Sequence, residues 1–263
     1  MRTIRQFQKD LKNYRNYIIY SGKSGLKAEI ANSHLSWMWW ILDPLLFMLV
    51  YSFIALVVFK KSEPYFPAFV FIGLSIWTFF ERTVKGSVKI VRSNKDIVSK
   101  VYLPKYVLIL VRMIMNGFKM LVSFSLVIVV MFIYRVPVTW NILYIVLCFL
   151  TIFFVTFGVS AFMLHFGVFV EDLFNVMNVV LKLVFYMSGI FYSITRNIPE
   201  PYLSILLKLN PVALVIDDLR SVMLYSTGLH WVVELVWLAA GMLLSYFGVY
   251  VIYKYENSYV KVI

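Results

Sequence analysis

The sequence predicts an all-α integral membrane protein with six transmembrane helices. Of its 263 residues, 62% are hydrophobic and only 14% are charged, a polar fraction too small to cover a soluble domain. Apolar stretches recur at roughly the 20-residue length that a helix needs to cross a bilayer. The formal charge of +12 does not indicate a nucleic-acid partner, because the basic residues gather beside particular apolar stretches.

Residues 1–36 are polar and basic, and we expect them to form a segment distinct from the membrane domain, residues 37–263. Apolar residues recur in this segment at spacings of three and four, which predicts an amphipathic helix at the cytoplasmic leaflet. The apolar face carries Ile4, Phe7, Leu11, Tyr14 and Ile18, and the basic face carries Arg2, Arg5, Lys9, Lys12 and Arg15. The basic face suits anionic headgroups; the alternative is a solvated basic helix with a small apolar stripe.

Six apolar stretches are the predicted spans, and they cover residues 37–59, 66–80, 106–134, 138–166, 173–194 and 231–253. The first begins with tryptophans, whose amphipathic rings favour the headgroup level. The second is short and needs flanking residues, including a snorkelling Arg82, to complete a span. The third and fourth are joined by only three residues, which predicts a tight hairpin.

The distribution of Lys and Arg predicts the orientation. Sixteen lie in the N-terminal segment, in residues 82–105 and in the C-terminal tail, whereas six lie in the intervening connections. The positive-inside rule therefore places both termini in the cytoplasm. The connections at residues 60–63, 135–137 and 196–230 are expected outside.

The connection before the sixth span holds two apolar pieces, residues 201–209 and 212–225, separated by Asn210-Pro211. Each piece is too short to cross a bilayer, and the residue before a proline disfavours helix. They predict a re-entrant outer hairpin, whose backbone ends are satisfied by protein or by water in a cavity.

Sequence signatures of catalysis are absent. Ser21-Gly22-Lys23-Ser24-Gly25 contains part of a phosphate loop, but the pattern requires a glycine where Tyr17 stands, so we predict a flexible turn. No HExxH, GxSxG or spaced pair of catalytic carboxylates occurs. One cysteine, Cys148, and three scattered histidines give no disulfide framework or metal cluster. We therefore expect no catalytic residue, metal or cofactor in this chain.

Charges within the predicted spans are costly in lipid and normally face protein or water. Arg112 and Lys119 are seven residues apart and share one face of the third span, and Lys182 lies about two turns into the fifth. They either meet a substrate phosphate or pair across the bundle with Asp43. Arg112 can also snorkel toward the cytoplasm.

Three segments resemble the permease subunits of ABC exporters for O-antigen, teichoic acid, capsule and rhamnose-rich wall polysaccharides. Residues 26–51, LKAEIANSHLSWMWWILDPLLFMLVY, show a Trp-rich helix start and a polar-Pro pair, with Asp43 where Asn is commoner. Residues 94–104 end in a run of Lys, Val, aromatic, apolar residue and Pro. Residues 189–225 carry Ile-Pro, Leu-Asn-Pro and a following Arg. The tail YENSYVKVI also fits, so the resemblance covers nearly the whole chain.

The resemblance implies a multi-pass permease of the bacterial cytoplasmic (inner) membrane that forms a homodimer and binds two copies of a separate ABC ATPase. That partner would hold ATP and Mg. The implied substrate is a lipid-linked polysaccharide; an ABC permease for a drug or small lipid is the alternative.

The ATPase contact is expected on two cytoplasmic segments, at Asn94, Asp96, Lys100, Tyr102, Pro104, Glu171 and Asp172. Charges and apolar residues alternate over 94–104, which suits a short coupling helix; a basic interfacial helix held only by lipid is the alternative. Glu171 and Asp172 have no nearby cation in sequence, so they either contact the ATPase or favour the start of the fifth helix electrostatically.

The expected channel is lined by Trp40, Phe47, Tyr51, Arg112, Lys119, Lys182, Tyr186 and Tyr192. Trp37, Phe185 and Phe191 belong to the same aromatic set. Aromatic faces hold the C–H faces of sugars loosely at many places; the alternative is that these rings face lipid. The resemblance places an outer gate at Asn210, Pro211, Asp217, Asp218 and Arg220.

Overall fold

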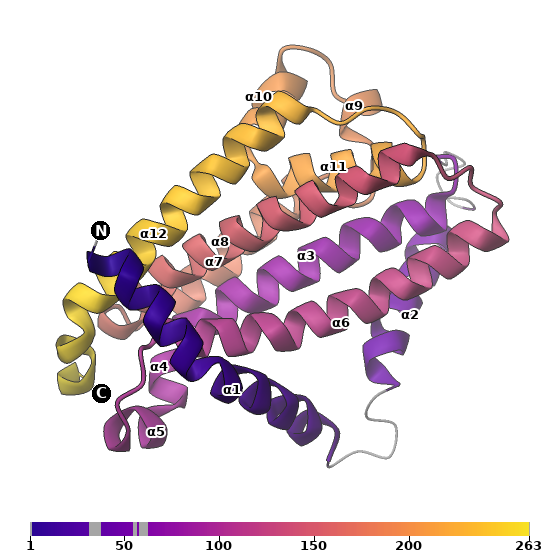
Figure 1. The fold of residues 1–263 in the computed structure, drawn as a ribbon. Helices are drawn as coiled ribbons and strands as arrows, with labels where there is room; N and C mark the ends of the chain where they lie inside the picture. The colour runs from indigo at the N-terminus through magenta and orange to yellow at the C-terminus, as the bar shows by residue number, and fades with distance from the viewer. Residues whose placement is uncertain (1, 32–37, 55–56, 58–62, 263) are drawn as a thin grey trace.

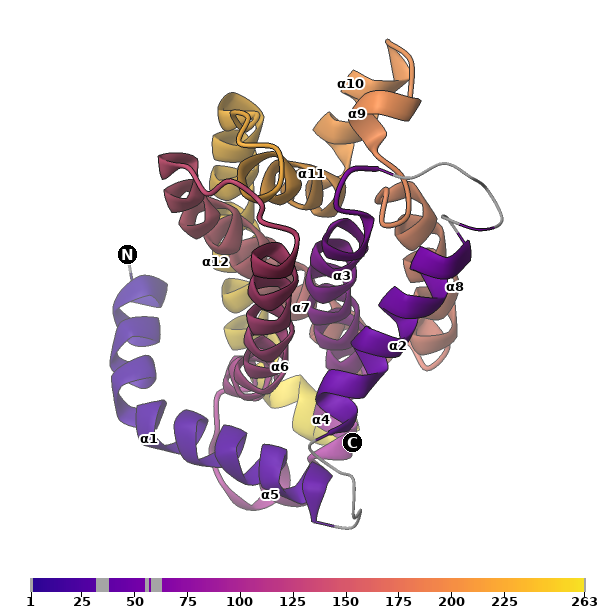
Figure 2. The same ribbon diagram turned by 90° about the vertical axis from the view of Figure 1, so that its right-hand side faces the viewer.

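The fold is a helical bundle built around one buried helix (Figures 1 and 2). The computed structural model describes residues 2–31, 38–54, 57 and 63–262, and the regular elements among them are all helical. The helices are α1 (Arg2–Ile30), α2 (Trp39–Phe53), α3 (Phe66–Val88), α4 (Ile90–Ser93), α5 (Lys95–Lys100), α6 (Tyr106–Ile133), the 3-10 helix η2 (Trp140–Tyr144), α7 (Ile145–Phe169), α8 (Leu173–Met187), α9 (Ile194–Asn197), α10 (Tyr202–Leu209), α11 (Pro211–Met223) and α12 (Trp231–Val262).

Helix α3 is the buried helix, and it packs against α2, α6, α7, α8 and α11. Val70, Ile72 and Ile76 along it have no exposed surface, as expected for a helix that is apolar on all sides. The predicted second span ended at residue 80, which is wrong for the helix. It continues to Val88, because protein packing rather than lipid surrounds its charged last turns.

Three helical segments among the described residues are long and apolar enough to cross a bilayer: residues 106–133, 140–169 and 231–259. They coincide with the predicted third, fourth and sixth spans. Helices α2 and α8 are apolar but shorter. The chain is thus an all-helical, multi-pass membrane protein, and the total of six spans stays a prediction.

Glycines allow α7 and α12 to approach each other closely. A Cβ atom added at Gly248 would lie 2.5 Å from the Cβ of Ala161, and one at Gly158 would lie 2.7 Å from the Cβ of Leu244. Small residues at such positions let two helices make extensive van der Waals contact, which is a main source of association in membranes. This pair therefore forms one wall of the bundle.

The fifth helix is shorter than the sequence indicated. The predicted span reached Ile194, but α8 ends at Met187. The Ser188 hydroxyl donates to the Val184 carbonyl at 2.7 Å, and Gly189 adopts a left-handed φ of +62°. Glycine tolerates this conformation, and the chain turns there instead of continuing as a helix.

The N-terminal amphipathic helix is confirmed as a helix, but the turn predicted at residues 21–25 is wrong, since α1 runs through them. Gly22 and Gly25 lie against Ile114 and Met115 of α6, with too little space for a Cβ. These glycines let α1 lie close along α6 (Figure 1). The apolar face packs on protein as well, because Ile18 is only 5% exposed.

We expect Gly167→Ala to lower the thermal unfolding temperature of the detergent-purified protein. A Cβ at Gly167 of α7 would overlap the Val88 carbonyl oxygen at the end of α3, and such overpacking costs about 1–3 kcal/mol. Gly228→Ala is the control, since nothing lies within 4 Å of a Cβ there. Equal unfolding temperatures for the two variants would contradict this account of the α3–α7 contact.

Candidate functional site

The predicted cytoplasmic and outer segments gather at opposite ends of the bundle. Both termini lie at the end that carries α4 and α5, and α9 and α10 lie at the other (Figure 1). At the second end, Arg196 forms an ion pair of 2.5 Å with Glu63, and the Ser226 hydroxyl donates to the Pro137 carbonyl at 3.1 Å. Glu63, the described residue of the predicted 60–63 connection, and Pro137 therefore both contact the 196–230 connection; residues 60–62 lie outside the described residues.

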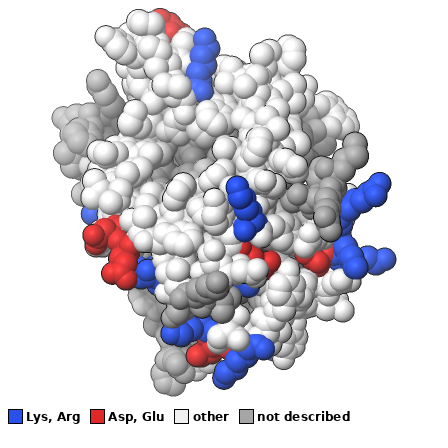
Figure 3. Space-filling model, turned by 90° about the vertical axis from the view of Figure 1, so that its left-hand side faces the viewer, with Lys and Arg blue, Asp and Glu red and all other residues white. Residues whose placement is uncertain are grey.

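A broad uncharged surface separates these ends. On the face drawn in Figure 3, charged side chains gather mainly in the lower part and uncharged ones cover most of the rest. Exposed apolar residues on the long helices include Phe132, which is 84% exposed, and Ile133 at 69%. Lipid is the solvent that suits such a surface.

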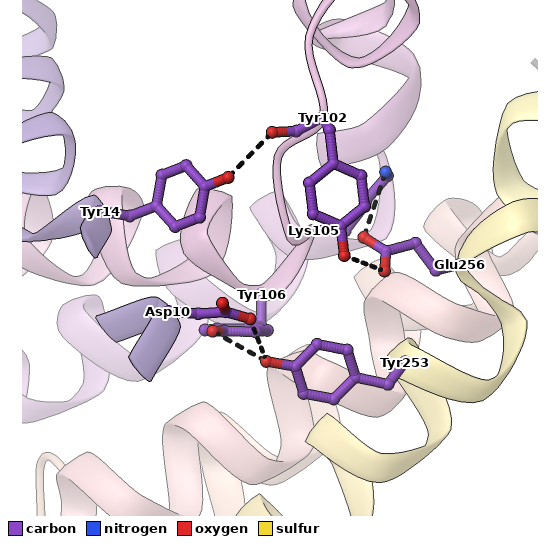
Figure 4. Close-up of polar contacts among 7 residues, drawn as sticks. All are labelled: Asp10, Tyr14, Tyr102, Lys105, Tyr106, Tyr253 and Glu256. Carbon is purple, nitrogen blue, oxygen red and sulfur yellow. Dashed lines mark hydrogen bonds and ion pairs between the residues drawn. The ribbon is translucent and has the colours of Figure 1, made fainter. Parts of the chain in front are cut away.

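At the end that holds the termini, a polar network joins the segment after α5 to the last helix (Figure 4). Lys105, only 2% exposed, places its Nζ 3.3 Å from Oε1 of Glu256. The Tyr102 hydroxyl donates to Oε2 of the same carboxylate at 3.2 Å. Partial burial and the Glu256 charge raise the pKa of Tyr102 to about 12, so the phenol keeps the proton that it donates.

Helix α1 belongs to the same network. The Tyr253 hydroxyl donates to Asp10 at 2.6 Å and lies 3.2 Å from the Tyr106 hydroxyl. The Tyr14 hydroxyl donates to the Tyr102 carbonyl at 3.0 Å. The beginning of the chain, the segment at 101–106 and the C-terminal helix are thereby tied together (Figure 4).

The predicted coupling segment contains a helix, α5, as the sequence indicated. Its Val98 is buried, whereas Asp96, Ile97, Lys100, Val101 and Tyr102 are exposed. Asn94 donates from its side chain to the Ile90 carbonyl at 2.7 Å, which fixes the junction with α4. Pro104 is buried beneath the segment. The outward surface thus mixes apolar and charged side chains, as protein-binding surfaces do.

Glu171 and Asp172 lie beside this segment, at the start of α8. No cation is near them in sequence, but one is near in space: Arg92 Nη1 lies 3.2 Å from Glu171 Oε1, and Arg92 Nη2 donates to the Val168 carbonyl at 3.1 Å. Arg92 is 79 residues away from Glu171 in sequence, so the local sequence pattern does not indicate this ion pair. The Asp172 side chain makes no capping hydrogen bond, which leaves it free to face a partner.

A cavity of about 820 Å³ lies among α2, α3, α6 and α8. It brings together six of the eight predicted channel residues: Trp40, Phe47, Tyr51, Lys119, Lys182 and Tyr186. The other two lie elsewhere. Arg112 packs against Gly86 of α3, and the Tyr192 hydroxyl donates to the Tyr186 carbonyl at 2.9 Å.

The cavity carries paired charges. Arg82 Nη2 lies 3.1 Å from Asp43 Oδ2, and Lys119 Nζ lies 2.5 Å from Oε2 of Glu29 on α1. The predicted pairing of Asp43 with Arg112 or Lys119 is therefore wrong, because nearer partners exist on α3 and α1. Sequence reasoning missed Glu29, Glu81 and Arg82 as cavity residues, since they lie at the ends of the apolar stretches.

Aromatic rings form a nearly continuous wall of this cavity. Tyr51 stacks on Phe191 with ring centroids 3.7 Å apart, and the Phe47 ring lies 6.4 Å from that of Tyr51. Trp77, which the sequence did not single out, meets Phe185 edge-on at 5.4 Å. Trp37 lies outside the described residues.

At the opposite end, the predicted hairpin is built as α10 and α11 around Asn210. Asn210 Oδ1 accepts from the backbone amides of Val212 and Ala213, each at 3.1 Å, so it caps α11, and Pro211 occupies the first turn. An Asn cap followed by proline is a preferred helix start.

Arg220 of α11 is buried, with 1% exposure, and it binds backbone carbonyls from two other elements. Its guanidinium donates to Gly189 at 2.7 Å, to Ile190 at 2.8 Å and to Phe69 at 3.1 Å. It also lies over the Phe69 ring. Arg220 thus fixes α11 to α3 and to the turn after α8.

The two neighbouring acids bind different groups. Asp217 accepts from the Thr195 hydroxyl at 2.7 Å, and Asp218 accepts from the His230 backbone amide at 2.9 Å. His230 Nδ1 lies 2.8 Å from the same Asp218 oxygen, and this hydrogen bond raises the pKa of His230 above its usual value. Buried Glu234 follows on α12. No spacing pattern in the sequence singled out His230 or Glu234.

The family is identified by comparison with known proteins. Residues 21–224 match the ABC-2 type transporter family, so the match contains the cavity, the coupling segment and the predicted outer gate. This chain belongs to the ABC-2 type transporter family. It is accordingly a transporter membrane subunit.

Curated relatives of this ABC-2 chain cover most of its length. The O-antigen export system permease protein RfbA of Myxococcus xanthus is 27% identical over 214 residues, 81% of this chain and 82% of the relative. Two proteins of the same name from Klebsiella pneumoniae are 26% and 25% identical, and each covers 90% of this chain and 91% of the relative.

We expect Glu256→Gln to destabilise the protein by about 3–5 kcal/mol, because it leaves the buried Lys105 charge unpaired. Replacing both partners by apolar residues, Lys105→Met with Glu256→Leu, should recover most of this loss. The matched control is Glu171→Gln, which breaks a pair whose carboxylate is 82% exposed and costs less than about 1 kcal/mol. Unfolding of the purified protein measures the free energy of unfolding of these three variants. Similar losses of stability in Glu256→Gln and Glu171→Gln would contradict the assignment of Lys105–Glu256 as a buried ion pair.

The His230–Asp218 contact should make stability depend on pH. The raised pKa means that the stabilisation is complete below the unfolded-state pKa of about 6.5 and is lost as pH rises through the folded-state value. His230→Phe should therefore lower the unfolding temperature more at about pH 6 than at about pH 9. A difference of equal size at both pH values would refute the ionic contribution.

Proposed function

We propose that this chain is the membrane subunit of an ATP-driven exporter that moves a lipid-linked polysaccharide across the bacterial cytoplasmic membrane. Its relatives named as O-antigen export permeases support this class of substrate. The observation that carries the proposal is the cavity walled by aromatic rings and bordered by paired charges. A drug or small-lipid exporter is the competing function, and the experiment below separates the two.

The chemistry of the cavity suits a sugar polymer. Each repeating unit presents weakly polar C–H faces, and stacking on an aromatic face is modest in energy and tolerant of position. Tyr51 and Phe185 provide such faces in the lining of the cavity, and Phe191 stacks on Tyr51. Lys119 and Lys182 border the same space and suit the phosphate that joins a glycan to its lipid.

We further propose that two copies of the chain enclose the cavity as a homodimer. Helices α2 and α8 border the cavity, and both also carry exposed apolar side chains: Phe53 and Val179 are each 61% exposed. A second copy that covers this face would turn the open cavity into a conduit. In this arrangement the chain has six spans, α2, α3, α6, α7, α8 and α12, with α1 as a separate interfacial segment and both termini in the cytoplasm.

The energy source in this proposal is a separate ABC ATPase, two copies of which hold ATP and Mg. The coupling face is α5 with the segment at 101–104, joined by Glu171 and Asp172. The Arg92–Glu171 ion pair keeps the two parts together, and the network at Lys105 and Glu256 connects them to α1 and α12. Motion of an ATPase bound there would reach the long helices.

The outer gate is proposed at α10 and α11. Arg220, Asp217 and Asp218 are each bonded to a different neighbouring segment, so α11 moves only with α3, α9 and the start of α12. A gate built in this way opens as a unit when those helices move.

The test is export of a lipid-linked glycan by the chain and its ATPase reconstituted in vesicles. We expect Tyr51→Ala to slow export roughly 2- to 10-fold, since one aromatic stack contributes about 0.5–1.5 kcal/mol. Phe132→Ala is the matched control, because Phe132 is 84% exposed on α6 and does not line the cavity. ATPase binding should be unchanged in both.

Transport of small amphiphiles but not of a glycan would favour the competing function. Equal export by both variants would show that the aromatic wall does not contact the polymer.

A further inference from the structure

A second, apolar groove of about 900 Å³ lies between α1 and the face formed by α6 and α7. Apolar side chains from four helices line it, among them Ile18 of α1, Phe79 of α3, Met113 of α6 and Ile152 of α7. Gly117 opens its floor: only Phe79, at 3.8 Å, lies within 4 Å of a Cβ added there. The groove is therefore deep enough for a hydrocarbon chain.

The polar residues of this groove are confined to one edge. Gln8, Lys12 and Arg15 of α1 are its polar lining residues, and within the described part of the chain no carboxylate lines it. Lys12 and Arg15 are exposed, lie three residues apart on one face of the helix, and form no ion pair among the described residues. A long apolar trough with two cations at one edge is complementary to a lipid with an anionic head.

We propose that this groove binds one anionic glycerophospholipid of the surrounding bilayer. An acyl chain lies between α1 and α6, and the phosphate lies between Lys12 and Arg15. Anionic lipid is favoured over zwitterionic lipid, because the headgroup ammonium of the latter would be placed beside two cations. The lipid holds α1 against the bundle in the region where Gly22 and Gly25 also contact α6.

The position of the groove argues against a second protein chain as its occupant. The groove lies beside α1, whereas α2 and α8 lie on the other side of α3 and α6 (Figure 2). A homodimer that closes the aromatic cavity through α2 and α8 leaves α1 at the periphery. Lipid is the molecule available there.

Native mass spectrometry of the full-length chain, equilibrated with equal amounts of phosphatidylglycerol and phosphatidylcholine, tests the site. We expect the wild type to retain phosphatidylglycerol preferentially. Lys12→Gln with Arg15→Gln should weaken this retention roughly 30-fold, since each basic residue near an anionic headgroup contributes roughly fivefold. The control is Arg5→Gln with Lys9→Gln, which removes the same charge from α1 outside the groove and should change retention less than about twofold.

A second variant tests the apolar part without changing charge. Gly117→Leu fills the floor and should reduce retained lipid at least about tenfold, whereas Val129→Phe, on α6 outside the groove, should not. Three results would overturn the proposal: equal retention of the two lipids by the wild type, equal loss in both charge variants, or a Gly117→Leu protein that keeps its lipid but dissociates into single chains. The last would identify the groove as a protein interface.

Discussion

The structure depends on satisfying backbone polar groups away from water. After α8 ends at Met187, the chain turns at Gly189 inside the bundle, and the carbonyls of Gly189 and Ile190 need donors that the helix no longer provides. The guanidinium of Arg220 supplies them and also binds Phe69 on the central helix. One buried side chain thus permits the broken fifth helix and positions α11 against the central helix.

The two ends of the bundle use opposite strategies. At the outer end, the buried Arg220 binds backbone carbonyls and the buried Asp217 accepts from a neutral hydroxyl. At the end that carries the termini, Lys105 and Glu256 are buried as a pair and surrounded by tyrosines. The first arrangement fixes a backbone shape, and the second joins segments distant in sequence.

How far the sequence predicted this structure depends on the range of the interactions. Spans such as α6 were placed to within about a residue, because length and hydropathy alone determine a lipid-facing helix. The extension of α3 to Val88 and the helical path through Gly22 were missed, since each depends on a neighbouring helix. The aromatic spacing on α2 pointed to most of the cavity wall, but the partners of Asp43 and Glu171 lie on other helices, and periodicity carries no information about them.

The Lys105–Glu256 contact has a consequence for biosynthesis. Lys105 is synthesised 151 residues before Glu256, so the lysine is without its carboxylate while those residues are made. The surface that includes Tyr102 therefore takes its final form only when the last turns of the last helix are in place. A polypeptide that stops short of Glu256 leaves the Lys105 charge without its carboxylate and the Tyr102 hydroxyl without its acceptor.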